Sequence, residues 1–320
     1  MKKCFIIYNE PGVDALADEL DVLDQVEHIE NHLKELGIDV KRKGITAGFM
    51  TEISLLAAEK PDFIFNLVES INNKGELNYF IPAMLNMYSI PYSGNPVEAM
   101  FVTTSKTLAG KTMRNAGIRN AVSFFPSQAD KLQPGKRYIL KPIWEDGSLG
   151  ITADSVFIFD KNTGERLSKL DDTHWFIEEF IDGREFNISV LAGKDGPQVM
   201  PFAEIVFVDY DDRPRIIDFK AKWEEDSFEY ENTIREFPGD KLSLKLQKEL
   251  RETALACWHL FGLKGYARVD VRIDSEENVY VIETNANPCI SPNGGYVAAT
   301  RQAGLTFTEV VQRIINDLNG

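Results

Sequence analysis

The sequence is poor in the features that mark several specialised classes of protein. Its three cysteines, Cys4, Cys257 and Cys289, lie far apart and form no CxxC pair. No stretch approaches the roughly 20 apolar residues of a membrane helix, and the beginning MKKCFIIYNEPG turns polar after Tyr8, unlike a secretory signal. We therefore expect reduced thiols in a cytoplasmic protein that neither spans nor binds a membrane.

Basic residues are also in deficit. The chain has 35 lysines and arginines against 50 acidic residues, a formal net charge of −15. A protein this acidic is a poor general binder of nucleic acid, so neither nucleic acid nor an anionic membrane is an expected partner. If the substrate is itself a polyanion, a few well-placed cations must overcome the surrounding negative field.

The order of the expected elements indicates more than one domain. At 320 residues, two or three packed units are the natural expectation. In the first third, short apolar strands such as KCFIIY and FIFNLV alternate with helices expected over 21–37, 51–60 (capped by Thr51) and 76–87. This alternation predicts a parallel sheet covered by helices, followed by regions richer in strands, an α/β and α+β fold class.

The stretch VYVIETNANP begins as an apolar strand that we expect to be buried on both faces, and it ends in oxygen-bearing side chains. Glu283 and Asn285 share one face of that strand, as Arg268 and Asp270 do in YARVDVRI, because residues i and i+2 of a strand point the same way. If the strands pair, Asp270, Glu283 and Asn285 form a set of hard oxygen ligands suited to Mg²⁺. Solvated acids at a strand end are the alternative.

The loop IWEDGSLGI directly follows the apolar strand RYILK. Its small residues Gly147, Ser148 and Gly150 would let backbone N–H groups approach phosphate oxygens, although the loop is neither a Walker A sequence nor a GxGxxG. Taken alone it favours an ordinary hairpin turn. Lys141 is more informative, because a lysine on an apolar strand must either extend to solvent or meet an anion.

The segment WFIEEFIDGREFNISV has a similar character. Glu178 and Glu179 end one apolar strand, and Glu185 begins another after an Asp-Gly turn. If this segment connects two lobes of the protein, its backbone groups could bind a flat heterocycle. One of its carboxylates could then hold ribose hydroxyls. A simple loop between strands is the alternative.

These pieces occur in an order that resembles the ATP-grasp superfamily, and within it the D-alanine–D-alanine ligase family. The resemblance covers nearly the whole chain after about Phe63, through FNLVES, SKTLAGKTMRNAGI, YILKP with EDGSLGI, IEEFIDGRE and YARVDV with VIETNANP. It implies an N-terminal parallel α/β (pre-ATP-grasp) domain over 1–95, then an ATP-grasp small lobe over 96–178 and a large lobe with the metal site over 179–320.

The resemblance also implies roles for the residues that would hold ATP. The two lysines that would contact phosphates are Lys106 and Lys141, and the loop that would close over them contains Gly147, Ser148 and Gly150. The nucleoside would be held by Glu178 and Glu179 beside the adenine and Glu185 at the ribose.

The remaining implied roles concern the reaction. Lys222 would reach the nucleotide from a mobile loop, and Arg268 would stabilise an oxyanion. Asp270, Glu283 and Asn285 would hold two Mg²⁺ ions, with Mn²⁺ as the alternative. The implied activity is an ADP-forming carboxylate–amine ligase that joins amino acids or short peptides through an acyl phosphate. A ligase with a non-amine acceptor, and a nucleotide-binding protein that has lost ligation, are the alternatives; a homodimer is left open.

Departures from the family pattern are concentrated where substrates would bind. Glu69 stands near the place of a pocket histidine, and ANPCISPNGG replaces a leucine–proline–glycine stretch, with Ser291 as the stand-in for its serine. The family's N-terminal acid has three candidates, Glu10, Glu19 and Asp21, between which the sequence does not choose. The reaction class is therefore better specified than the substrate.

Overall fold

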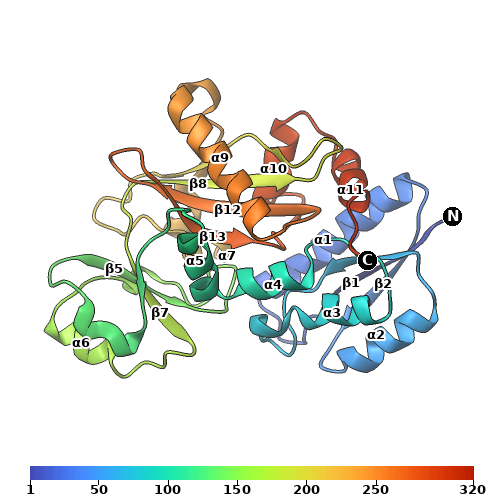
Figure 1. Cartoon of the computed structure of the whole chain (residues 1–320), viewed down its shortest axis with the longest axis horizontal. Coiled ribbons are helices and arrows are strands. Elements are labelled where there is room, and N and C mark those ends of the chain that lie inside the picture. The colour runs from blue at the N-terminus through green and yellow to red at the C-terminus, as the bar shows by residue number, and fades with distance from the viewer.

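The computed structural model describes the backbone of all 320 residues and every side chain except that of Asp18. Three separate sheets organise the chain (Figure 1), of three, four and six strands. The three-stranded sheet lies at the N-terminal end, the four-stranded sheet at the opposite end, and the six-stranded sheet between them.

The N-terminal sheet is parallel, with the order β2-β1-β3, as the alternation of strands and helices predicts. Its strands are β1 (Lys3–Asn9), β2 (Asp39–Ile45) and β3 (Phe63–Leu67), and its helices are α1 (Ala17–Glu35), α2 (Phe49–Ala58) and α3 (Phe80–Met87). Cys4 and Ile6 of β1 pack towards α1, whereas Phe5 and Ile7 pack towards α2 and α3. Both faces of β1 are therefore buried, which explains its unbroken apolar run.

The four-stranded sheet has the order β4-β7-β5-β6 and is antiparallel. Its strands are β4 (Ser123–Phe124), β5 (Arg137–Pro142), β6 (Val156–Ile158) and β7 (Trp175–Glu179), accompanied by α6 (Lys161–Leu167). Tyr138, Phe157 and Ile177 form a small core with Leu167 of α6 on one face. The opposite face carries Lys141 and Glu178.

The six-stranded sheet has the main order β11-β10-β8-β12-β13, with β9 paired to β8. The strands are β8 (Arg184–Leu191), β9 (Gln198–Val199), β10 (Ala203–Phe207), β11 (Thr233–Glu236), β12 (Tyr266–Ile273) and β13 (Val279–Asn285). Helix α9 (Leu244–Leu260) covers one face through Leu246, Leu250 and Cys257, which pack with Ile188 and Val269. The other face is polar.

Several element boundaries differ from the predicted ones. Helix α2 begins at Phe49 with Gly48 at its N-cap, so the expected Thr51 cap is wrong. Strand β13 is an edge strand whose burial alternates, so the expected burial on both faces is also wrong. The remaining helices are α4 (Val97–Thr104), α5 (Lys106–Asn115), α7 (Phe219–Trp223), α8 (Phe228–Asn232), α10 (Gly295–Gln302) and α11 (Phe307–Ile315).

A β-bulge interrupts the pairing of β12 with β13. Val271 lies opposite Val281, but the preceding Asp270 lies opposite Glu283, so Ile282 is an extra residue on β13. Before the bulge, Val279 and Val281 face the core under α9. After it, the odd-numbered residues of β13 are opposite the polar residues of β12. The bulge therefore turns Glu283 from the core face to the polar face.

A buried ion pair joins β8 to β12. Glu185 lies opposite Arg272, and its Oε2 accepts hydrogen bonds from Arg272 Nε at 3.1 Å and Nη2 at 2.8 Å. Arg272 also donates to the carbonyl of Ile181 at 2.9 Å and to that of Arg215. The two charged side chains are only 5% and 6% exposed, so each depends on the other for compensation.

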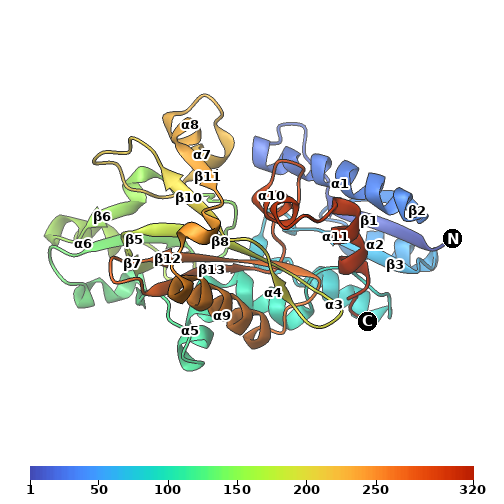
Figure 2. The ribbon, with the colours of Figure 1, turned by 90° about the horizontal axis from the view of Figure 1, so that it is seen from above.

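The N-terminal sheet and the C-terminal end of the chain share one core. Ile6 and Val26 belong to the same cluster of buried side chains as Tyr266, Tyr296 and Val310. Figure 2 shows α10 and α11 beside α1. This core contains residues from before the predicted domain limit at 95/96 and from after the one at 178/179. The two limits stay predictions. No described helix is both long and apolar enough to cross a membrane.

One histidine lies at the contact between α1 and α11. The His28 ring stacks on Phe307 with centroids 4.0 Å apart, and its buried Nε2 has no hydrogen-bond partner. Burial first, then the facing His32 and Arg301, lower the pKa of His28 from 6.5 to about 4.

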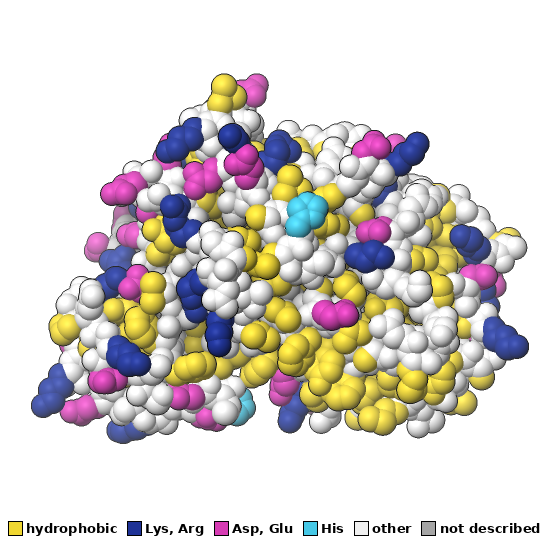
Figure 3. Space-filling view, in the orientation of Figure 1, with side chains coloured by type: hydrophobic (Ala, Val, Ile, Leu, Met, Phe, Trp, Pro, Cys, Tyr) yellow, Lys and Arg dark blue, Asp and Glu magenta, His cyan; other side chains and the backbone are white. Residues whose placement is uncertain are grey.

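Apolar side chains gather on the outer surface of α2 and α3. Met50 and Leu55 of α2 line a shallow groove with Phe80 and Met87 of the α3 region. Figure 3 shows this apolar surface at the lower right of the molecule. It is remote from the polar face of the six-stranded sheet.

The buried pair generates a stability prediction. Arg272→Met should lower the free energy of unfolding by about 3–5 kcal/mol, because Glu185 would be left as an uncompensated buried carboxylate. Urea unfolding of the purified variant measures this. The matched control is Arg184→Met, whose ion pair with Glu204 involves a 45% exposed arginine and should cost about 1 kcal/mol or less. Equal costs for the two variants would contradict the assignment.

His28 generates a pH prediction. Because the folded-state pKa lies below 6.5, the unfolded chain takes up the proton first, and stability present at neutral pH is lost as the pH falls from 6.5 towards 4. His28→Phe keeps the ring contact without the titration. Urea unfolding at pH 7 and pH 5 should show a decrease in the parent protein that is about 2 kcal/mol larger than in the variant. The exposed His259→Gln should leave the parent's decrease unchanged.

Candidate active site

The pairing of β12 with β13 brings together the three residues predicted to bind metal. Asp270 lies opposite Glu283, and Arg268 lies opposite Asn285. Asn285 Nδ2 is 3.2 Å from Asp270 Oδ2 and 3.5 Å from Glu283 Oε2. Two carboxylates and an amide thus occupy adjacent positions on the polar face of the sheet.

Arg268 is fixed by its neighbour on the same strand. Its Nε and Nη2 each donate to one carboxylate oxygen of Asp270 at 2.7 Å. Burial opposes the charged form, but the contact with Asp270 outweighs it and raises the pKa of Arg268. Asp270 Oδ1 also accepts from Asn187 Nδ2 at 2.9 Å. The sequence analysis missed Asn187, although it lies two residues after Glu185 on the same face of β8.

Lys106 connects α5 to the end of β13. Its Nζ is 2.8 Å from Glu283 Oε1 and 2.8 Å from Asp146 Oδ1, and it donates to the carbonyl of Glu145 at 2.6 Å. Burial opposes ionisation of Glu283, but Lys106, Lys222 and Arg268 together lower its pKa to about 2. Glu283 is therefore a carboxylate at neutral pH. The sequence analysis missed Asp146, which belongs to the loop quoted for its small residues.

The side chains at this place fit a hard cation. Glu283 Oε1 is buried and accepts no hydrogen bond of good geometry, although the Lys106 ammonium is within ion-pair distance. Among the described side chains no group of three His, Cys, Asp or Glu is arranged to hold a metal. The candidate set consists instead of two carboxylates and one amide. Such a small number of protein ligands suits Mg²⁺, whose coordination is then completed by phosphate oxygens and water.

Lys141 meets an anion. On the inner face of the four-stranded sheet its Nζ is 2.7 Å from Glu178 Oε2, and both side chains are largely buried, at 16% and 9% exposed. Glu179 points to the opposite face, because successive residues of a strand alternate, and its Oε1 is 2.5 Å from Lys136 Nζ. The structure thus brings Lys141 and Glu178 together and separates the Glu179 side chain from them.

The small-residue loop lies against the segment that carries Lys222. Gly147, Ser148 and Gly150 all have positive φ, of +67°, +66° and +77°, which explains the need for glycine at two of these positions. Ser148 Oγ donates to the carbonyl of Ile217 at 2.7 Å, and Trp223 Nε1 donates to that of Gly147 at 3.1 Å. The loop and the segment that carries Lys222 are therefore held against each other.

Lys222, on α7 between these contacts, faces the polar side of the sheet. Burial and the nearby Arg268 lower its pKa, against the attraction of Glu283, Asp270 and Asp146. It forms no ion pair within the described part of the chain. Lys222 is thus a cation without a direct counter-ion next to the candidate metal ligands.

The segment that contains the predicted substrate residue Ser291 is close to Arg268, on which its neighbour Cys289 acts electrostatically. Ser291 is buried, and its Oγ is 3.0 Å from Cys289 Sγ. Cys289 donates to Asp21 Oδ2 at 3.1 Å, so Asp21 is the N-terminal acid that contacts this segment. Glu19 instead accepts from the Leu16 N–H at the start of α1. Glu69 and Cys289 both act electrostatically on buried Tyr266, raising its pKa after the larger effect of burial.

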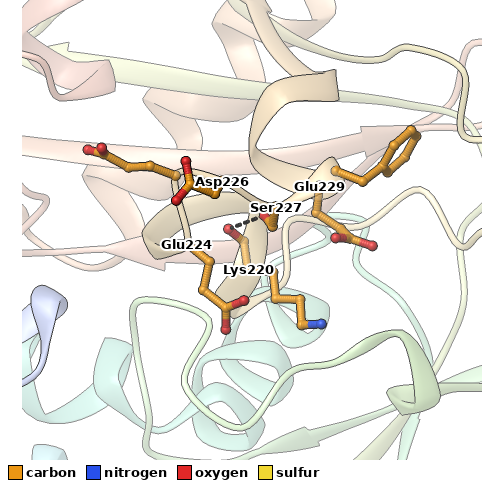
Figure 4. A pocket seen from close by; sticks show the side chains of 7 residues that line it. Lys220, Glu224, Asp226, Ser227 and Glu229 are labelled. Carbon is orange, nitrogen blue, oxygen red and sulfur yellow. Dashed lines mark hydrogen bonds between the residues drawn. The ribbon is translucent and has the colours of Figure 1, made fainter.

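An acidic hollow of about 430 Å³ lies beside α7, outside this group of residues. Figure 4 shows Lys220 among Glu224, Asp226 and Glu229, with Ser227 Oγ donating to the Lys220 carbonyl at 3.3 Å. These side chains are solvated and give no sign of a ligand.

Relatives by sequence point to one family. Residues 137–316, more than half of the chain, match the family described as D-ala D-ala ligase C-terminus. An uncharacterized protein of Sinorhizobium fredii is 26% identical over 265 residues, 81% of this chain and 75% of that protein. A D-alanine–D-alanine ligase of a Synechococcus species is 26% identical over 261 residues, 78% of this chain and 74% of that protein.

Solved structures agree in fold. The D-alanine–D-alanine ligase of Bacillus anthracis complexed with ATP has a TM-score of 0.73 at 19% identity, covering 99% of this chain and 97% of that one. The VanG D-Ala:D-Ser ligase of Enterococcus faecalis has a TM-score of 0.73 at 17% identity, covering 98% of each. The predicted fold class is confirmed. By its sequence match and its fold, the chain belongs to the D-alanine–D-alanine ligase family of ATP-grasp enzymes.

Proposed function

We propose that this enzyme is an ADP-forming ligase that activates a carboxylate as an acyl phosphate and joins it to the amine of an amino acid or short peptide. The observation that carries the proposal is the arrangement on β12 and β13. Asp270, Glu283 and Asn285 lie beside one another, with Lys106 on Glu283 and Arg268 on Asp270. This is a suitable arrangement for handling phosphate charge next to an acyl centre.

Different residues of the chain have different roles in the proposed phosphoryl transfer. Lys106 and Lys141 bind phosphate oxygens in exchange for their carboxylate partners, Glu283 and Glu178. A bound Mg²⁺ supplies neutralisation of the transferring charge, and Asp270, Glu283 and Asn285 are the residues that would hold it. Lys222, which has no direct counter-ion, is available to orient the group in transfer.

The second step places negative charge on the acyl oxygen. Arg268, held rigidly by Asp270, is positioned to stabilise that oxyanion, an effect worth roughly 3 kcal/mol per donor in other acyl transfers. An acyl phosphate also needs protection from water. We infer that the two segments joined through Ser148 and Trp223 exclude water from it.

The substrate end favours a departure from plain D-alanine. Glu69 and Cys289 both act electrostatically on Tyr266, and Cys289 contacts Ser291 and Asp21. Acidic groups there favour an ammonium or a basic side chain on the first substrate and disfavour a further acid. We propose Asp21 as the N-terminal acid of the substrate site.

The test is ADP release from ATP and Mg²⁺ with pairs of D- and L-amino acids and short peptides, against ATP alone. Release that requires both a carboxylate donor and an amine acceptor supports the ligase. Release that requires a hydroxy acid in place of the amine supports a non-amine acceptor. Nucleotide binding with no release in any combination contradicts ligation.

The metal assignment gives a direct prediction. Glu283→Gln and Asp270→Asn should each lower kcat by a factor of about 10² or more, because phosphoryl transfer would proceed with less compensated charge. Steady-state ADP release over a Mg²⁺ titration measures this. Glu276→Gln, in the exposed turn of the same hairpin, is the control and should leave kcat unchanged. Near-normal turnover of either site variant at ordinary Mg²⁺ would refute the assignment.

The substrate proposal gives a second prediction. D-alanine alone should release ADP more slowly than another amino-acid or dipeptide pair, because Glu69 places an added carboxylate near the first substrate. Glu69→His should shift the ratio of kcat/KM values towards D-alanine by about tenfold, the effect of one charge pair. Efficient formation of D-Ala-D-Ala by the parent protein would contradict this proposal.

A further inference from the structure

The turn SGNP, residues 93–96, is hydrogen-bonded to both strands that carry the candidate metal ligands. It directly precedes α4, and its Asn95 is buried, at 3% exposed. Asn95 Nδ2 donates to the carbonyl of Tyr266 at 2.9 Å and to that of Ala286 at 2.5 Å. Tyr266 begins β12, and Ala286 directly follows β13. One side-chain amide therefore joins the ends of the two strands.

The orientation of this amide is determined by its three partners. Asn95 Oδ1 accepts from the N–H of Lys264 at 2.7 Å. If the amide were reversed, its oxygen would face two carbonyl oxygens and its NH₂ group would face an N–H, so none of the three hydrogen bonds could form. Tyr266 and Ala286 are buried, so water has little access to their carbonyls. A buried acceptor that loses its donor costs about 1–3 kcal/mol.

The turn that carries Asn95 is fixed on two sides. The Ser93 N–H donates to the carbonyl of Ile64 at 2.8 Å, and Ser93 Oγ accepts from the N–H of Asn66 at 3.0 Å, so the turn is bound to β3. Near the end of the chain, Asn319 Nδ2 donates to the carbonyl of Gly94 at 2.7 Å. Asn95 therefore projects from a part of the molecule that is itself well anchored.

The pairing of β12 with β13 ends within the candidate active site. Arg268 opposite Asn285 is the last pair between these strands, and β13 is an edge strand with no further strand beside it. The end of an edge strand frays more easily than a strand with neighbours on both sides. Asn95 binds the carbonyl one residue after Asn285 and the carbonyl two residues before Arg268. It therefore holds the strand ends together where the pairing stops.

We propose that Asn95 is a positioning residue that keeps Asn285 and Arg268 in place for the reaction by joining the ends of β12 and β13. This inference rests on the proposed ligase function. Asn95 acts through the two strand ends and not on a substrate. A functional site requires its groups to be held within about 0.5 Å of the productive geometry, so a small displacement of Asn285 would weaken the site without unfolding the protein.

The first experiment follows the strand end in the ligand-free protein. Amide hydrogen exchange, measured by mass spectrometry, is compared in the parent protein and in Asn95→Ala, which removes all three hydrogen bonds. We expect exchange across residues 284–288 to become about tenfold faster or more, because the end of β13 loses its connection to the turn. Exchange across residues 63–67 of β3 should stay unchanged.

The second experiment measures the site itself. The affinity of the protein–ATP complex for Mn²⁺, followed by electron paramagnetic resonance, should fall about tenfold in Asn95→Ala, as when partners that orient metal ligands are removed. In ADP release, the apparent activation constant for Mg²⁺ should rise by a similar factor and kcat should fall about tenfold. KM for the amino-acid substrates should stay within about threefold, and the affinity for ATP without metal should not change.

The matched control is Asn78→Ala. Asn78 is buried to a similar degree, at 4% exposed, and its Nδ2 donates to Thr104 Oγ1 at 2.9 Å and not to β12 or β13. This variant should lower the free energy of unfolding without changing Mn²⁺ affinity or exchange across residues 284–288. Asn95→Ser keeps one hydroxyl donor and should lie between the parent and Asn95→Ala in each measurement. It carries the test if Asn95→Ala does not fold.

The outcomes separate this inference from the ligase function. Unchanged exchange across residues 284–288, or unchanged Mn²⁺ affinity, in a folded Asn95→Ala overturns the role of Asn95. A loss of stability equal to that of Asn78→Ala, with no change in Mn²⁺ affinity, also overturns it, because Asn95 would then only stabilise the fold. If the parent releases no ADP with any amino acid, the proposed ligase function falls, whereas exchange and Mn²⁺ affinity still decide the role of Asn95.

Discussion

The antiparallel pairing of β12 with β13, shifted by one residue at Ile282, is the constraint on which the rest of the candidate site depends. On the side of the bulge where β13 begins, the two strands contribute Val271, Val279 and Val281 to the core beneath α9. On the side where β13 ends, the same strands present Asp270 opposite Glu283 on the polar face. Without the extra residue, Glu283 and Asn285 would point into an apolar core, where an ionised carboxylate is far too costly.

Charge compensation explains how a chain with a net charge of −15 can prepare a site for a polyanion. Each carboxylate near the centre has a cationic partner, Lys106 on Glu283, Lys141 on Glu178 and Arg272 on Glu185. The first two pairs involve lysines, whose ammonium groups are flexible point charges, whereas in the third Arg272 donates two hydrogen bonds to one oxygen of Glu185. We infer that the lysine pairs are exchangeable and the arginine pair is structural.

The sequence predicts the ordered motifs and the shared faces of short strands well, because strand alternation is a local property. Glu283 and Asn285 do share a face, and Lys141 does meet an anion. The bulge and the Glu185–Arg272 pair depend on which strands become neighbours, and no local pattern encodes them. The Thr51 cap is wrong because α2 already begins at Phe49, two residues before Thr51, with Gly48 as its N-cap.

Because the two ends of the chain share one core, the N-terminal sheet has all its strands without the C-terminal helices but not all of its packing. Tyr296 of α10 and Val310 of α11 are buried with Ile6 and Val26, although the N-terminal sheet is complete within the first 67 residues. A fragment cut at residue 95 would expose the apolar side of α1, and a fragment lacking the N-terminal sheet would expose α11. The two ends must therefore unfold as one cooperative unit, so that recombination between relatives would have to exchange both ends together.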